Sequence, residues 1–260
     1  METLLGNILT RISEKLTPRK ETPPRLNDQE ANRLINQTID VRNLEARVNK
    51  PFEDTQIESL ARLTLELGDR LEQYDTILSD DASGRLVTLL LKNIADRKRK
   101  EKGQNPTRVF FVAGGHYEKE EKKPAKNAVE EFIASKREEL GKTLLVTEHI
   151  FSGKSIMLLI NILENQGVDF DVAAVSILSR PYSTEDTYDY RLTKRLYYGS
   201  IGNAGYYMYG QRLQAGVHKT IKGQTQAHPV KHEQYDPALV KQAREDVKLL
   251  GGELYKLISY

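Results

Sequence analysis

Between residues 74 and 180, short continuous apolar runs alternate with apolar residues at helical spacing. The runs predict strands over YDTILS, TRVFFVAGG, TLLVT and FDVAAVSIL. Between them, apolar residues that recur every three or four positions predict three helices, which end near Gly103, Gly141 and Gly167. Alternation of strand and helix is typical of parallel strands joined by crossover helices. We therefore expect an α/β fold with a doubly wound, mostly parallel sheet covered on both faces.

Residues 1–72 have helical spacing and predict a helical extension. Within the first 16 residues, an apolar stripe fits packing on the protein's own body, or on a second subunit of a homodimer, better than contact with a membrane. The reason is that nothing on the opposite face is strongly cationic. Two capping pairs, Asn27 with Glu30 and Thr55 with Glu58, then predict the starts of two amphipathic helices.

Residues 181–260 form a third predicted region, which is rich in tyrosine. Eight tyrosines lie between positions 182 and 209, interleaved with arginine and lysine. Rings beside cations suit a nucleobase or a single RNA strand bound through residues 180–212, and they equally suit half-buried surfaces and subunit contacts. Asp236 and Pro237 start a final helix, which we expect to end at Gly251 and Gly252. The predicted organisation is a helical extension (1–72), an α/β core (73–180) and this hood-like, tyrosine-rich region (181–260).

Composition narrows the classes of protein to consider. The 260 residues are 38% hydrophobic and 29% charged, the net charge is +2, and there is no cysteine. A nearly balanced charge gives no reason to expect general nucleic-acid binding, and the lack of cysteine excludes disulfides, thiolate metal sites and a cysteine nucleophile. No apolar run reaches the length of a membrane span, and the amino terminus lacks the basic start of a signal peptide. We expect a cytoplasmic protein that does not enter a membrane.

The segment TEHIFSGKS, residues 147–155, leaves the third predicted strand and enters a helix. In α/β sheets the ligand lies at such strand ends. Backbone amides and the positive end of the helix would surround an anion at Ser152, Gly153, Lys154 and Ser155. A Walker A loop needs a glycine five positions before Gly153, where this chain has Glu148, and no dinucleotide fingerprint has the required spacing. An acidic residue just before a phosphate loop suits a sugar phosphate, because a carboxylate accepts hydrogen bonds from ribose hydroxyls.

Together with the earlier segment SDDASGR, this pattern resembles the type I phosphoribosyltransferases. In that family a hydrophobic strand is followed by an acidic pair, two mostly apolar positions and a turn of small residues. Here Thr147 and Glu148 stand at the acidic pair, and residues 151–155 form the turn. SDDASGR resembles the family's pyrophosphate loop, which also follows a strand and opens a helix. The resemblance covers roughly residues 74–180, and it departs from the family at Thr147, which replaces an acid, and at Phe151, which replaces a small residue.

The resemblance implies an activity and roles for individual residues. Phosphoribosyl pyrophosphate, carrying Mg²⁺, would lose pyrophosphate from C1′, and a nitrogen acceptor such as a nucleobase would take its place. Glu148 would orient the ribose and Arg85 would face the pyrophosphate. The substrate-binding residues would be Thr147, Ser152, Gly153, Lys154, Ser155, Asp81, Ala82, Ser83 and Gly84. No direct metal ligand is identified in the chain, because the Mg²⁺ arrives with the substrate. The alternative is a non-catalytic member of the same fold that senses a nucleotide or binds RNA.

Overall fold

The computed structural model describes residues 26–48, 54–80, 84–112, 123–151, 153–177, 195–202, 217–218, 228–229 and 237–259. At its centre is a five-stranded, entirely parallel sheet with the strand order β2-β1-β3-β4-β5. The strands are β1 (Thr76–Asp80), β2 (Arg108–Val112), β3 (Thr143–Ile150), β4 (Phe170–Ile177) and β5 (Leu196–Ile201). The predicted α/β class and the four predicted strands are confirmed. β5 is a further strand that was not predicted, and it lies in the tyrosine-rich region.

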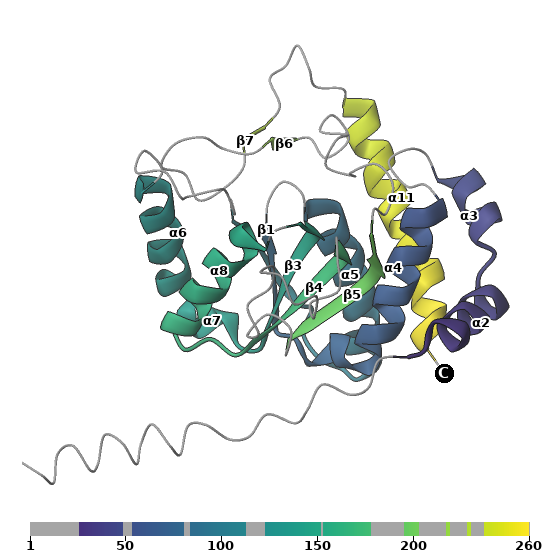
Figure 1. The fold of residues 1–260 in the computed structure, drawn as a ribbon, viewed down its shortest axis with the longest axis horizontal. Coiled ribbons are helices and arrows are strands. Elements are labelled where there is room, and N and C mark those ends of the chain that lie inside the picture. Colours follow the sequence, from purple (N-terminus) through teal and green to yellow (C-terminus); the bar gives the residue numbers. More distant parts are fainter. Residues whose placement is uncertain are drawn as a thin grey trace, which may run out of the picture.

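Helices cover both faces of this sheet (Figure 1). One face is covered by α4 (Asp54–Leu67), α5 (Arg85–Glu101) and α11 (Pro237–Tyr255), the other by α6 (Lys123–Ser135), α7 (Arg137–Leu140) and α8 (Lys154–Asn165). On β3, Leu144 and Val146 belong to the core under the first group, and Leu145 belongs to the core under the second. Successive residues of a strand point to opposite faces, so a strand buried on both sides must be apolar throughout. This is why the strands were visible as continuous apolar runs.

The described chain begins with helices that pack outside the sheet. α2 (Asp28–Thr38) starts as predicted, because the Asn27 side chain accepts a hydrogen bond of 2.8 Å from the backbone N–H of Glu30. Asp40 then caps a separate helix, α3 (Val41–Arg47), by accepting a bond of 3.0 Å from the N–H of Asn43. Where the sequence predicted one helix, the structure therefore has two, separated by extended backbone.

The next helix, α4, does not begin at its predicted N-cap. Its first residue is Asp54, so Thr55 lies inside the helix and the predicted helix start at Thr55 is wrong. The hydroxyl of Ser59, one turn later, donates to the Thr55 carbonyl at 2.8 Å. The described part of the chain thus has three helices before β1, where two were predicted, followed by a 3₁₀ turn, η1 (Gly68–Gln73).

The final helix also differs from its prediction. Gly251 and Gly252 lie within α11, which continues to Tyr255 and into a 3₁₀ turn, η5 (Lys256–Ile258), so the predicted end at these glycines is wrong. A Cβ added at Gly251 would lie 2.8 Å from Oδ1 of Asn93 on α5. The glycine therefore allows α11 to approach α5 closely and does not terminate the helix.

β5 forms one edge of the sheet and lies against α4. A Cβ at Gly199 would overlap the backbone carbonyl of Ser59, so only glycine permits this approach. Ser59 Oγ is hydrogen-bonded to Ser200 Oγ at 3.0 Å. Tyr197 and Tyr198, two of the eight clustered tyrosines, lie in this strand, and both pack against the core. For these two tyrosines, the structure agrees with the predicted alternative of half-buried packing.

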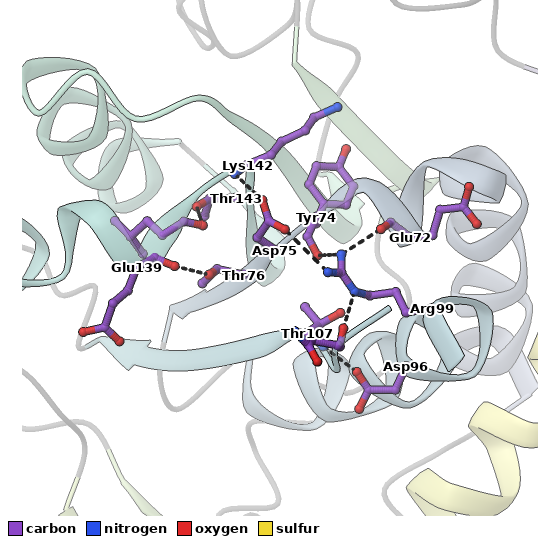
Figure 2. A network of polar contacts seen from close by, with 12 residues as sticks. Glu72, Tyr74, Asp75, Thr76, Asp96, Arg99, Thr107, Glu139, Lys142 and Thr143 are labelled. Atoms are coloured by element: carbon purple, nitrogen blue, oxygen red, sulfur yellow. Dashed lines mark hydrogen bonds and ion pairs between the residues drawn. The ribbon is translucent and has the colours of Figure 1, made fainter. Parts of the chain in front are cut away.

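Polar contacts join the segments that precede the strands at the amino edge of the sheet (Figure 2). Arg99 donates from Nη1 to the backbone carbonyls of Glu72 and Tyr74 at 2.8 and 3.0 Å. Asp75 accepts a bond of 3.1 Å at Oδ2 from the backbone N–H of Lys142. These bonds tie the start of β1 to α5 on one side and to β3 on the other. The amino edge is thereby held by structural contacts, and it fixes the register in which β1 and β3 run together.

Some predictions concern residues outside the described part of the chain. They are the helix over the first 16 residues and the clustered tyrosines other than Tyr197 and Tyr198. The remaining described elements are two short antiparallel strands, β6 (Val217–His218) and β7 (His228–Pro229). Among the residues that the structure describes, no helix has both the length and the apolar character needed to cross a membrane.

Candidate functional site

The two candidate loops follow adjacent strands. β1 pairs in parallel with β3, with Ser79 opposite Val146, so both strands end at the same edge of the sheet. The chain leaves β1 outward to β2 and then returns to β3 on the other side of β1, so the strand order reverses between β1 and β3. In open α/β sheets, ligands bind outside the carboxyl ends of the strands at such a reversal. The loops predicted from sequence therefore meet where this class of fold places its ligand.

Gly84 brings the loop after β1 against β3. Its N–H donates to the Asp80 carbonyl at 2.8 Å and closes the loop. A Cβ at this position would lie 2.7 Å from the Val146 carbonyl oxygen and 2.9 Å from Ser79 Oγ, which leaves no room for a side chain. α5 begins at the next residue, so Gly84, which has no side chain to cap a helix, is its N-cap. Asp81, Ala82 and Ser83 lie outside the described residues.

Gly153 occupies the corresponding place after β3. Its φ of 73° lies in the left-handed region, which glycine adopts without strain. α8 starts immediately after it, and the Met157 N–H donates to the Gly153 carbonyl at 2.9 Å. The predicted turn into a helix is present. Ser152 lies outside the described residues, as do the side chains of Lys154 and Ser155, and their predicted phosphate contacts stay predictions.

Two buried carboxylates lie at the ends of these strands. Asp80 on β1 exposes 4% of its surface, and Glu148 on β3 exposes 1%. Thr147, at the place of the first acid of the predicted pair, is also buried and donates from Oγ1 to Asp80 Oδ2 at 3.4 Å. Asp80 was not among the predicted site residues. Its sequence signal was its position at the end of a predicted strand, next to the predicted site residue Asp81.

His149 and Ser176 form a second polar pair that sequence reasoning did not find. They stand opposite each other on β3 and β4, and Nδ1 of His149 is hydrogen-bonded to Ser176 Oγ. Burial lowers the pKa of His149 to about 4, so the imidazole is neutral at pH 7. Because neighbouring residues of a strand point to opposite faces, His149 lies on the α8 side of the sheet and Glu148 on the α5 side.

Arg85 is the first residue of α5 and is half-buried. Its guanidinium carbon lies 4.0 Å from the centroid of the Phe111 ring on β2. Phe111 stands opposite Ser79 in the pairing of β2 with β1, so the stacked pair lies beside the loop after β1. At the end of β3, Phe151 exposes 57% of its surface, whereas the apolar residues of that strand are buried.

The described edge thus combines two loop-to-helix junctions, two buried carboxylates and one half-buried arginine. Helix starts and an arginine attract anions, and carboxylates accept hydrogen bonds from hydroxyl groups. Within the described ranges, no three His, Asp or Glu side chains are grouped as a metal site would require. In comparisons with known proteins, no family model, no curated protein and no solved structure matches this chain.

Proposed function

We propose that the chain is a phosphoribosyltransferase-like protein that binds phosphoribosyl pyrophosphate with its Mg²⁺ and transfers the phosphoribosyl group to a nitrogen acceptor such as a nucleobase. One observation carries the proposal. The junctions at Gly84 and Gly153 open two helices at the ends of adjacent parallel strands, where the strand order reverses. The two strands that lead into these helices are neighbours, about 4.8 Å apart, so one ligand at this edge would meet both helix N-termini.

The substrate has two anionic groups, and the edge has two helix starts to receive them. The start of α8, beyond Gly153, suits the 5′-phosphate because its first amides have no partners inside the helix. The start of α5 carries Arg85, whose charge adds to the helix dipole and suits the more highly charged pyrophosphate. This assignment puts the leaving group next to β1 and the retained phosphate next to β3.

The carboxylates at the ends of β1 and β3 suit the ribose hydroxyls. Glu148 stands at the position where the resemblance implies a residue that binds the ribose. The acid missing at Thr147 has a counterpart across the strands, because Thr147 is hydrogen-bonded to Asp80. With 1% of its surface exposed, Glu148 can touch a ligand only when the groups that cover it move aside. Binding would therefore involve a rearrangement at this edge.

The chemistry asks little of the protein beyond position and charge. Departure of pyrophosphate leaves a cationic, oxocarbenium-like centre at C1′, which the nitrogen acceptor attacks. The chain's contribution would be to hold both partners in line and to neutralise the leaving group, with Arg85 and the α5 amides acting on the pyrophosphate oxygens. Glu148 would fix the orientation of the ribose.

Calorimetric titration of the full chain tests this proposal. The ligands are phosphoribosyl pyrophosphate with Mg²⁺, ribose 5-phosphate and nucleoside monophosphates, and the variants are Glu148→Gln and, as a control on an exposed acid far from the site, Glu45→Gln. We expect the native protein and Glu45→Gln to bind phosphoribosyl pyrophosphate alike. Glu148→Gln should bind at least about tenfold more weakly, since glutamine keeps an acceptor oxygen but loses the negative charge that strengthens its bond to a ribose hydroxyl. Absence of binding to every ligand would contradict the proposal.

A second candidate function is a sensor that binds the same ligand without catalysis. Two observations favour it: Thr147 stands where an acid is expected, and the bulky, exposed Phe151 stands where a small residue is expected. An assay of pyrophosphate release with a panel of nucleobases separates the two functions. Tight binding of phosphoribosyl pyrophosphate with no release for any acceptor would favour the sensor.

A further inference from the structure

We infer that Phe111 is a positioning residue, which holds the Arg85 guanidinium at the start of α5 so that Arg85 can bind the pyrophosphate group. This inference rests on the proposed function and adds a residue from β2 to a site otherwise built on β1 and β3. Nothing in the sequence pattern singled out Phe111, which reads there as one apolar residue of a predicted strand.

The geometry fits a cation–π contact. The guanidinium carbon of Arg85 lies 4.0 Å from the centroid of the Phe111 ring, well within the range of about 6 Å over which such contacts act. Both side chains are half-buried. The ring covers one face of the guanidinium and leaves the charge of the group intact, because an aromatic ring attracts a cation without neutralising it. A guanidinium held over the ring also has less freedom to move, which favours a fixed arrangement of its five N–H donors.

The position of Arg85 suits an anion bound at the start of α5. A cation in the first turn of a helix is repelled by the helix dipole, and the first turn of α5 contains no acidic residue. An anion bound at this helix start would be attracted both by the dipole and by the arginine. The stack on Phe111 offsets part of the repulsion and keeps the guanidinium at the helix start.

A second observation points to a polar ligand at the same helix start. Ser79 Oγ is completely buried and has no hydrogen-bond partner among the described residues. It points at the α5 N-cap, since a Cβ on Gly84 would lie 2.9 Å from it. Thr88 Oγ1, near the start of α5, is also completely buried and has no hydrogen-bond partner among the described residues. Buried hydroxyl groups of native proteins nearly always have a partner, so two such groups beneath one helix start mark a place where a polar group binds.

The test is a double-mutant cycle on the full chain. Phe111→Leu and Phe111→Tyr are made in the native background and in Arg85→Ala, and binding of pyrophosphate with Mg²⁺ and of ribose 5-phosphate is measured calorimetrically. We expect Phe111→Leu to weaken pyrophosphate binding about fivefold to tenfold and Phe111→Tyr to preserve it, because tyrosine keeps the ring. In Arg85→Ala, Phe111→Leu should have no further effect, and none of the variants should change the affinity for ribose 5-phosphate.

Three results would overturn the inference while leaving the proposed function intact. They are pyrophosphate binding that is unchanged in Phe111→Leu, equal weakening in the presence and absence of Arg85, and equal loss of affinity for pyrophosphate and ribose 5-phosphate. The last two would mean that Phe111 only supports the fold. If the native protein binds neither compound, nor phosphoribosyl pyrophosphate, the proposed function fails and this inference fails with it. Should Phe111→Leu not fold, Phe111→Tyr still tests the inference, because a loss of pyrophosphate binding in this variant, which keeps the ring, would overturn it.

Discussion

Replacement of Gly84 by alanine tests the close approach of the loop after β1 to β3. The added methyl group would lie 2.7 Å from the Val146 carbonyl oxygen, 2.9 Å from Ser79 Oγ and 3.2 Å from the Asp80 carbonyl oxygen. Two of these three atoms belong to the backbone of the central strands and cannot rotate away. The φ of Gly84 is −75°, which alanine adopts readily, so the effect comes from crowding and not from backbone strain.

The size of the effect follows from three contributions. Crowding of a well-packed site costs about 1–3 kcal/mol. Alanine is a poorer N-cap than glycine, by roughly 0.5–1 kcal/mol. Alanine also restricts the unfolded chain, which returns about 0.4–1 kcal/mol. The last two nearly cancel, so we expect Gly84→Ala to lower the free energy of unfolding by about 2 kcal/mol, chiefly through crowding.

Urea unfolding followed by circular dichroism measures this loss. With a slope of about 3 kcal/mol per M, the midpoint should fall by about 0.7 M. Gly252→Ala is the matched control, because its methyl group would meet only the end of the Arg97 side chain, 3.2 Å away, which can move. Since alanine favours a helix interior over glycine by about 1 kcal/mol, the control should be as stable as the native chain or more so. A Gly84→Ala protein with an unchanged or higher midpoint would refute the close approach of the loop to β3.

Three further predictions concern stability. Gly251→Ala should lower the unfolding midpoint although its neighbour does not, because its methyl group would lie 2.8 Å from Asn93 Oδ1; equal midpoints would contradict this. Burial lowers the pKa of His149 from 6.5 to about 4, so the unfolded chain takes up the proton first, and stability is complete above about pH 6.5 and is lost as the pH falls towards 4. Between pH 7 and 4, the free energy of unfolding of His149→Asn should therefore fall by about 2 kcal/mol less than that of the native chain, as measured by urea titrations. Equal falls in the two proteins would disprove the lowered pKa of His149. Tyr74→Phe should lower the free energy of unfolding by about 1 kcal/mol, because the buried phenol donates to Asp171 Oδ2 at 2.8 Å; calorimetric melting at the native temperature would argue against that bond.

The core of the fold was predictable because its signals are local. Each of the four predicted strands is a continuous apolar run, and each crossover helix shows its own spacing. β5 was missed because Gly199 interrupts its pattern. That glycine is explained by the close approach of α4, a contact with Ser59 that no window of sequence contains. The glycines of α11 predicted a helix end for a similar reason. Gly251 instead allows a close approach to Asn93 on α5, a contact that its own segment does not reveal.

The candidate site was predictable in its parts and not in its connections. The turn at Gly153 and the helix starts follow from residue type alone. The contact between Asp80 and Thr147 depends on β1 lying beside β3, and the stack of Arg85 on Phe111 depends on β2 lying on the other side of β1. Sequence spacing cannot supply either neighbour. The burial of Glu148 likewise results from the surrounding chain and not from its own segment.

The contact between α4 and β5 also has a consequence for how the chain folds during synthesis. The bond between Ser59 and Ser200 joins positions 141 residues apart. At about 5–20 residues per second, the ribosome needs roughly 7–28 s to produce the second partner after the first. Throughout that interval the apolar side of α4, including Leu60 and Leu63, has been made but its final neighbour has not. The packing of α4 against β5 must therefore be completed late, after most of the chain has been synthesised.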